Sequence, residues 1–490
     1  MKRTLSFALA LMCVCSLAAC GGGGGDTENA GNAADSAAVT TEAETVDELA
    51  DNLPAADYQG YTFRLGASDE NNAYNLHFFY TEEMNGETVN DAVYQANANV
   101  QERFNIKYQW VPIAGITNSN SYQAVQTAVQ AGDDIYDLVT LHDTGSMTAV
   151  LAGCCYNIKE IPHLDFTRPW WPKLSSDSLT VNGRLYHIST DINYYCLGST
   201  RAVFMNVDMA KDLNIEIPYD MVREGKWTLD AWMNMTKDAY VDVNGDGVKD
   251  QGDKYGFVIT GRTYDVLEGF GIDVWGRTKD GKQIVLDFYN ENTIKVVETT
   301  CRWLFSGGYS TFYDYSLPNS VSGGGIVMFN NGQTLFNYNS ITRHVEACND
   351  VNYTILPQPK LDENQADYHG GCNDNPLVVP VTQKDYDRTG MIIEAMSAEG
   401  HKVIRPAYIE VALKSRYAID TGASEMLEII FANRVLSGGY LFRKSDTGLQ
   451  MVCNALWQNK SDTPDVASFY ETSKAGEQQR IDEINKFYNQ

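Results

Sequence analysis

The amino-acid sequence predicts an α/β protein with two lobes, and two observations support that prediction. Strand and helix patterns alternate from residue 61 to residue 141, in the order strand, helix, strand, helix, strand. This order is typical of a parallel, doubly wound sheet. The folded part of the chain, about residues 57–490, is too long for one hydrophobic core, so we expect it to divide into two lobes.

The first lobe is predicted to open with three strands and two helices. In the first helix, Val93, Ala96, Val100 and Phe104 recur at helical spacing. The elements in order are a strand over 61–66, a helix from its cap Asn90 to about 104, a strand over 106–110, a helix over about 121–131 and a strand over 135–141.

Two acidic residues directly follow strands of this predicted sheet. Asp69 comes after the first strand and Asp143 after the third. Because ligands of doubly wound sheets bind beyond the carboxyl ends of the strands, both residues are candidates for binding.

Later patterns predict a second α/β lobe after about residue 200. A hairpin over 179–186 with an Asn182-Gly183 turn precedes it. The later elements are strands over 202–206, 254–259, 334–339, 353–356 and 377–381, and helices over about 227–240, 292–306, 384–399 and 423–436.

The N-terminal residues predict export and a lipid anchor. Lys2 and Arg3 precede an apolar run over 4–19, which ends in Leu-Ala-Ala before Cys20. The pattern resembles the lipobox of bacterial lipoproteins, which implies a signal peptide over 1–19 and a diacylglyceryl thioether on Cys20. The alternative is an ordinary signal peptide with an incidental cysteine. Because the run is too short for a membrane span, we expect acyl chains alone to hold the mature chain at the extracellular face of the membrane.

Residues 20–56 are predicted to form a flexible, lipidated linker. They contain five consecutive glycines and then acidic and small residues without Lys or Arg. Such a segment cannot bury enough apolar area to fold. The whole chain carries a formal charge of −27, which argues against nucleic acid as a partner and against a surface that lies on an anionic membrane.

The cysteines after Cys20 show no metal-ligand spacing. We interpret most of them as small buried apolar residues, and one or two disulfides stay open because the chain is exported. They are Cys154, Cys155, Cys196, Cys301, Cys348, Cys372 and Cys453.

The clearest chemical motif is a calcium-type loop over 242–253. Oxygen ligands at alternate positions can wrap Ca²⁺, and a glycine at the sixth position permits the turn. The last position is Asp where the calcium-hand signature has Glu. A strand pattern follows, so we expect an isolated structural calcium site; the alternative is a solvated acidic turn. The predicted ligands are Asp242, Asn244, Asp246, the Val248 carbonyl, Asp250 and Asp253.

Signatures of catalysis are missing from the sequence. It contains neither G-x-S-x-G nor H-E-x-x-H, and its seven histidines show no ligand spacing. We therefore do not expect an enzyme.

Several stretches, taken in their order along the chain, resemble the extracellular solute-binding proteins (family 1) of bacterial ABC transporters. The stretches are NGETVNDAVY at 85–94, YDLV at 136–139, PWW at 169–171, NGRLY at 182–186, GKWTLD at 225–230, FNNGQ at 329–333 and YTILPQPK at 353–360.

The resemblance implies a two-lobe, periplasmic-binding-protein-like fold with interleaved lobes and a hinge. It places 57–195 and 342–400 in the N-lobe, and 199–340 and 403–490 in the C-lobe. The crossings between lobes would then lie near 196–199, 340–343 and 400–403. Members of this family bind mono- or oligosaccharides and deliver them to a permease, so we expect a monomeric saccharide-binding lipoprotein.

The resemblance also implies a set of saccharide-binding residues. A sugar ring presents an apolar face to aromatic side chains and hydroxyls to carboxylates and amides. Where maltodextrin binders place a tryptophan near the return crossing, this chain has Thr342, which argues against a maltodextrin. The Trp residues at 227, 232 and 303 are expected in the core. The binding candidates are Asp69, Asp143, Tyr194, Tyr195, Tyr264, Trp275, Asn339 and Arg343.

Two other functions stay open from the sequence. One is a surface glycan-binding lipoprotein that is not coupled to transport. The other is a polysaccharide-degrading enzyme, which the missing catalytic motifs disfavour.

Overall fold

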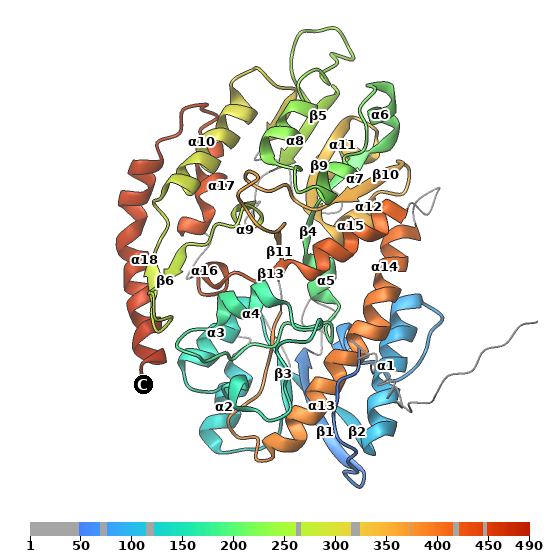
Figure 1. The fold of residues 1–490 in the computed structure, drawn as a ribbon, viewed down its shortest axis with the longest axis vertical. Helices are drawn as coiled ribbons and strands as arrows, with labels where there is room; N and C mark the ends of the chain where they lie inside the picture. The colour runs from blue at the N-terminus through green and yellow to red at the C-terminus, as the bar shows by residue number, and fades with distance from the viewer. Residues whose placement is uncertain are drawn as a thin grey trace, which may run out of the picture. The chain divides into compact units, whose positions relative to one another are not determined.

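Two larger β-sheets organise the computed structural model of this chain (Figure 1). The structure describes residues 49–68, 76–113, 122–260, 266–314, 324–373, 375–414, 421–443 and 448–490. Residues Asp47–Gln490 form one compact unit.

The first sheet has four strands. β1 (Tyr61–Ser68) lies between β2 (Ile106–Ile113) and β3 (Leu138–Thr140) and runs parallel to both. β12 (Leu377–Val378) adds to β3 in the antiparallel sense. The helices α1 (Thr88–Phe104) and α2 (Gln123–Ala131) connect the parallel strands, so the predicted doubly wound start is confirmed.

Helix α1 follows its predicted pattern closely. Val93, Ala96, Val100 and Phe104 are all buried. The helix begins two residues before the expected cap, because Glu87 takes the N-cap position, and it ends at Asn105 in the left-handed conformation.

The second sheet has five strands in the order β10-β4-β9-β5-β8. The pairs β10–β4 and β4–β9 are antiparallel, whereas β5 runs parallel to β9 and β8. The strands are β4 (Arg201–Asn206), β5 (Tyr255–Thr260), β8 (Thr311–Asp314), β9 (Thr334–Ser340) and β10 (Tyr353–Leu356).

One strand lies in a different sheet from the one that the predicted lobe boundaries imply. β10 falls within 342–400, which was assigned to the N-lobe, yet it pairs with β4. The helix α12 (Ile341–Ala347) turns the chain back after β9, and all four side chains of β10 become buried on the edge of β4. The chain therefore returns to the first sheet later than the predicted 340–343, between β10 and β12.

Three connections join the two sheets in the described part of the chain. The first runs from Ile188, which bridges to Leu377, through α5 (Tyr195–Ser199) to β4. The second runs from β10 to β12 and contains β11 (Gly370–Gly371). The third is helical throughout.

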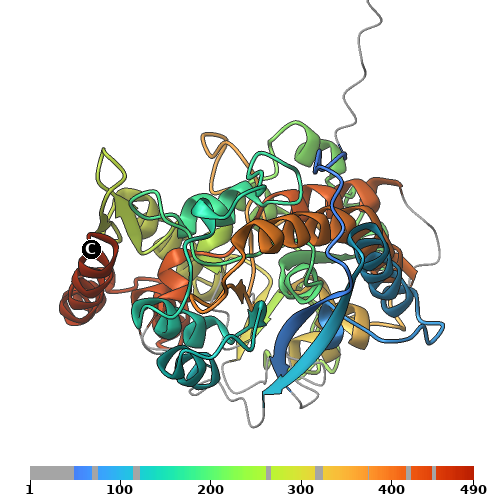
Figure 2. The ribbon, with the colours of Figure 1, turned by 90° about the horizontal axis from the view of Figure 1, so that it is seen from below.

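The third connection consists of α13 (Tyr386–Glu399), the π-helical segment η3 (Gly400–Ile404) and α14 (Arg405–Lys414). α13 packs against α1, and α14 contacts α12 and α15 (Thr421–Ala432) (Figure 2). The predicted crossing near 400–403 coincides with η3.

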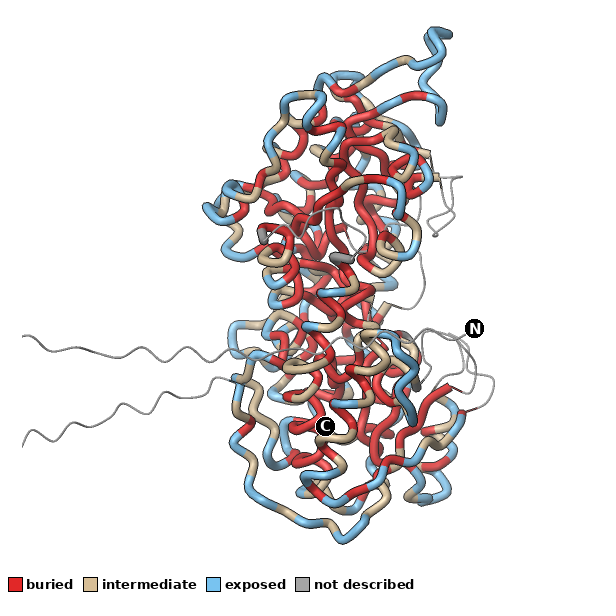
Figure 3. The backbone as a smooth tube through the Cα atoms, turned by 90° about the vertical axis from the view of Figure 1, so that its right-hand side faces the viewer, coloured by how far each residue is buried: buried red, intermediate tan, exposed pale blue. Residues whose placement is uncertain are grey.

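Large aromatic side chains fill the interior beside the five-stranded sheet. Trp303 stacks on Phe257 with ring centroids 4.5 Å apart, and Trp232 meets Trp303 edge-on at 4.8 Å. Trp227 is also fully buried, so the three tryptophans expected in the core lie there. Figure 3 shows the buried residues concentrated in the interior of the fold.

The cysteines and the predicted hairpin turn agree with the sequence interpretation. All seven described cysteines are buried as thiols. Asn182 and Gly183 have φ of 49° and 72° between the bridged residues Val181 and Arg184. The predicted hairpin over 179–186 is shorter than expected. Residue 179 is the last residue of the helix α4 (Lys173–Leu179), and the two arms pair only at the bridge between Val181 and Arg184.

The remaining elements are shorter or peripheral, and no helix of the described residues has the length and hydropathy needed to cross a bilayer. They are η1 (Leu76–Phe78), α3 (Asp143–Leu151), η2 (Ile158–Glu160), α6 (Val207–Asp212), α7 (Tyr219–Arg223), α8 (Leu229–Met235), α9 (Val266–Gly269), β6 (Trp275–Arg277), β7 (Ile284–Leu286), α10 (Glu291–Phe305), α11 (Gly324–Asn330), β13 (Arg434–Val435), α16 (Gly438–Leu441), η4 (Leu449–Met451), α17 (Val452–Trp457) and α18 (Val466–Tyr488).

Candidate ligand-binding site

A charged cluster lies where α3, just after β3, contacts α16 and the residues that follow it. Asp143, the first residue of α3, is 5% exposed. Its Oδ1 lies 2.6 Å from His142 Nδ1, and its Oδ2 lies 3.1 Å from Nη2 of Arg443. The Arg443 guanidinium in turn covers the ring of Tyr440, 3.7 Å from its centroid. The predicted candidate Asp143 is therefore paired with a residue 300 positions later in the chain.

This cluster offers both kinds of hydrogen-bonding group that a polyhydroxylated ligand needs. The carboxylate of Asp143 accepts hydrogen bonds, while the planar guanidinium of Arg443 donates in a fixed fork. The charges of Asp143 and Arg443 offset each other.

Arg443 and Tyr440 were not among the residues predicted from the sequence. The nearest sequence signal is the Gly438-Gly439 pair just before them, because paired glycines often mark a close approach of two backbones. An added Cβ at Gly438 would lie 2.8 Å from the Trp275 ring, and one at Gly439 would lie 2.5 Å from Trp275 Nε1.

Trp275, a second predicted candidate, packs against the same segment. Its ring meets Phe442 edge-on, with centroids 4.7 Å apart, and the side chain is 7% exposed. Neighbouring Asp273 accepts hydrogen bonds from the Gly439 amide at 3.0 Å and from the Ser178 hydroxyl at 3.2 Å. Residues 438–443 thus contact both Asp143 and Trp275.

Trp275 also lines a polar cavity of about 480 Å³ between the segment that joins α9 to β6, the residue after β7 and the start of α10. The cavity is open to solvent and rich in carboxylate and amide groups. Its lining residues are Gly271, Ile272, Asp273, Trp275, Asp287, Asn290, Glu291 and Asn292.

The two predicted tyrosines belong to another cluster, at the start of the first connection. The Tyr194 ring lies 5.0 Å from Phe78 and 6.0 Å from Tyr408. Tyr195 meets Phe78 at 5.2 Å. Burial raises the pKa of Tyr194, so its hydroxyl stays protonated and can donate a hydrogen bond.

Asn339 and Arg343 lie on β9 and α12. Asn339 is 4% exposed, and its Oδ1 accepts from Arg201 Nη1 at 3.4 Å. Arg343 is half-buried, and burial raises the pKa of nearby Glu346 while the Arg343 charge partly offsets that rise. Asn339 therefore serves the packing of the sheet in this conformation.

Three predicted residues lie outside the described part of the chain. They are Asp69, which follows β1, Tyr264, which lies between β5 and α9, and the predicted lipidation site Cys20.

The calcium-type loop is ordered by its own hydrogen bonds. Asp242 accepts from the amides of Gly245 at 2.7 Å and Gly247 at 2.9 Å. The buried Asp253 accepts from Tyr240 Oη at 3.0 Å and from the Val243 amide at 3.1 Å.

No group of three or more His, Cys, Asp or Glu side chains within the described ranges is placed to hold a metal ion. Since the carboxylates are turned toward backbone amides, Ca²⁺ would have to draw Asp242, Asp246 and Asp250 together. The predicted ligand set stays a prediction.

No protein-family profile and no curated protein matches this sequence. Many solved structures do match its fold. M. tuberculosis UspC superposes with a TM-score of 0.54 at 14% identity, over 87% of this chain and 100% of that one. The apo form of RafE from Streptococcus pneumoniae gives 0.52 at 14%, over 88% and 98%. A cyclo/maltodextrin-binding protein complexed with maltotetraose gives 0.51 at 13%, over 87% and 96%.

At these identities the likeness shows the fold. The predicted class is confirmed: the chain has an α/β fold with two larger sheets, which it shares over 87% of its length with a cyclo/maltodextrin-binding protein.

Proposed function

We propose that this protein is a membrane-anchored solute-binding protein that captures a saccharide between its lobes and delivers it to an ABC permease. The observation that carries the proposal is the fold, which is shared over 87% of the chain with a cyclo/maltodextrin-binding protein. The lipobox-like sequence ending in Cys20 supports an anchor at the extracellular face of the membrane.

The pair Asp143–Arg443 is our choice for the centre of the saccharide site. A sugar hydroxyl can accept from the guanidinium and donate to the carboxylate at the same time, so a ligand can replace the direct bond between the two without stranding either charge. Both side chains are less than a tenth exposed, and hydrogen bonds in such a site compete little with water. Tyr440, under the guanidinium, supplies an aromatic surface nearby.

Binding is expected to couple to lobe closure. Asp143 follows a strand of the four-stranded sheet, whereas Arg443 lies beyond β13 and α16. A ligand that bonds to both residues holds these two parts of the chain together. Closure follows only if those contacts are stronger in the closed state than in the open one.

A thermal-shift screen against a saccharide library, followed by calorimetry with the best ligand, tests the proposal. Asp143→Asn and Arg443→Gln should each weaken binding by about ten- to a hundredfold, as expected for a buried anchor. Arg223→Gln is the matched control, because Arg223 is an exposed arginine that is paired with Glu425. If no saccharide binds the wild-type protein, the proposed ligand class is wrong.

The permease is tested separately, in membrane vesicles that contain a candidate transporter. Saccharide uptake should require the binding protein and should fall with Asp143→Asn. Binding without any transporter-dependent uptake would favour a surface glycan-binding protein instead.

A further inference from the structure

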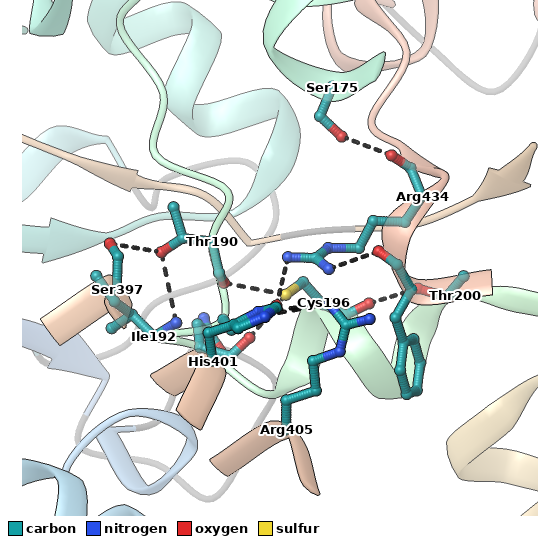
Figure 4. Close-up of polar contacts among 12 residues, drawn as sticks. Ser175, Thr190, Ile192, Cys196, Thr200, Ser397, His401, Arg405 and Arg434 are labelled. Carbon is teal, nitrogen blue, oxygen red and sulfur yellow. Dashed lines mark hydrogen bonds and ion pairs between the residues drawn. The ribbon is translucent and has the colours of Figure 1, made fainter. Parts of the chain in front are cut away.

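The buried carboxylate of Asp191 lies among the connections between the two sheets. Asp191 is fully buried, on the first connection just before α5. Its Oδ1 lies 2.6 Å from Arg434 Nη2, and its Oδ2 lies 2.7 Å from His401 Nδ1 and 3.6 Å from Arg405 Nη1. Figure 4 shows His401, Arg405 and Arg434 converging on one point.

The partners of Asp191 belong to the other two connections. His401 lies in η3 and Arg405 begins α14, so both are part of the third connection. Arg434 lies in β13, which pairs with β11 of the second connection through Gly370. The Asp191 side chain therefore lies on the first connection and contacts the third directly. It reaches the second connection through Arg434, whose strand pairs with β11.

The backbones of the first and third connections also pack without space between them. A Cβ added to Gly400 would overlap the carbonyl oxygen of Asp191. One residue earlier in the chain, the Thr190 hydroxyl lies 3.1 Å from that of Ser397 on α13 (Figure 4). The first and third connections therefore contact each other through their backbones as well as through the ion pairs of Asp191.

The charges in this cluster keep the carboxylate ionised. Burial alone would raise the pKa of Asp191, but Arg434, His401 and Arg405 together hold the pKa well below its usual range. Arg434 is itself 1% exposed, so the guanidinium and the Asp191 carboxylate each replace the water that the other lacks. Removing one partner would leave an unpaired buried charge, which is strongly unfavourable.

We propose that Asp191 is the pivot of the hinge: it locks the three connections into one unit, about which the lobes rotate when a ligand is captured. The rotation on ligand capture rests on the proposed function, whereas the locking of the three connections can be measured on the ligand-free protein. Asp191 acts as a positioning residue, because it reaches the ligand only through the orientation of the lobes.

Hydrogen exchange of the ligand-free, full-length protein tests the locking. In Asp191→Asn, the amides of residues 188–200, 370–373 and 396–405 should all exchange about tenfold faster or more, because the three connections open as one unit. The strands β1 and β9 should keep their protection. Faster exchange confined to residues 188–192, or no change, would overturn the proposal.

Asp137→Asn is the matched control. Asp137 is also fully buried and paired with an arginine, Arg64, at 2.8 Å, but both residues belong to the four-stranded sheet and its surroundings. This variant should raise exchange around residues 61–64 and leave the connections protected. If it opens all three connections as well, Asp191 has no special role.

A second variant covers the case in which Asp191→Asn does not fold. Asp191→Leu combined with Arg434→Met replaces the ion pair by apolar side chains, a change that buried pairs often tolerate. The protein should fold, yet residues 396–405 should still exchange faster, because His401 has lost its carboxylate partner and Arg405 has lost one of two carboxylates, keeping Glu428. Full protection there would contradict the proposal.

Calorimetry with a saccharide that binds the wild-type protein adds the functional readout. Asp191→Asn should bind about tenfold more weakly, and small-angle scattering should show incomplete compaction, whereas Asp137→Asn should match the wild type. Absence of any saccharide binding by the wild type would refute the proposed function while the exchange experiment still decides the pivot.

Discussion

Glu394 on α13 should make the stability of this protein fall as the pH rises toward neutrality. Its carboxylate is fully buried and accepts a hydrogen bond from Trp170 Nε1 and another from Trp171 Nε1, both at 3.0 Å. Burial raises the pKa of Glu394 to about 7, which outweighs the opposite effect of the hydrogen bonds from Trp171 and Trp170.

The sign and size of the effect follow from proton linkage. A raised pKa means that the folded protein holds a proton between pH 4.5 and about 7 while the unfolded chain has already released it. The stabilisation is complete below pH 4.5 and is lost as the pH rises through about 7. The difference between a pKa of 4.5 in the unfolded chain and about 7 in the folded protein corresponds to about 3 kcal/mol in the free energy of unfolding.

Urea unfolding across this pH range, on the wild type and on Glu394→Gln, measures the effect. The variant cannot titrate, so the difference in unfolding free energy between the two proteins should change by about 3 kcal/mol from pH 4.5 to 7. The difference is the quantity to use, because burial lowers the pKa of His187 to about 3, which gives a slope of opposite sign. Glu298→Gln on the exposed face of α10 is the control. Parallel curves for wild type and Glu394→Gln would refute the reasoning.

Three further outcomes are expected. Gly439→Ala should destabilise the protein by about 1–3 kcal/mol, because its Cβ would crowd Trp275 and Asp273. Gly476→Ala on α18 is the control and should be neutral or stabilising, because nothing lies within 4 Å of the added Cβ. Equal melting temperatures for the two variants would contradict this packing. EDTA should lower the melting temperature and Ca²⁺ should restore it, with no response in a variant that carries Asp242→Ala and Asp246→Ala; identical wild-type curves would leave an acidic turn without metal. Cys20→Ser should abolish lipid labelling and release the protein from the membrane fraction, whereas wild-type protein with an unmodified N-terminus in the medium would exclude the anchor.

Strands and helices whose pattern is local were predicted well. The alternation of residues 106–110 matches the alternating burial at the start of β2, whereas the binding role of Asp143, expected from its position after β3, stays a prediction. The crossing near 400–403 was implied by the family resemblance and stays a prediction.

Residues whose role depends on distant partners were missed. Nothing in the segment around Arg443 indicates that its guanidinium meets Asp143, 300 residues away. Asp191 and Arg434 are 243 residues apart and gave no local signal either. The strand at 353–356 was expected from its composition, but its sheet was not, because the free edge of β4 decides where it pairs.

The burial of every described thiol makes this protein convenient for distance measurements. Burial raises the pKa of Cys301 and of Cys348 to about 12, and a protonated, inaccessible thiol reacts slowly with maleimides. Two cysteines introduced on exposed positions, one beside each sheet, should therefore take up dyes selectively once Cys20 is blocked by its lipid or replaced. Single-molecule fluorescence could then follow the separation of the two dyes in real time.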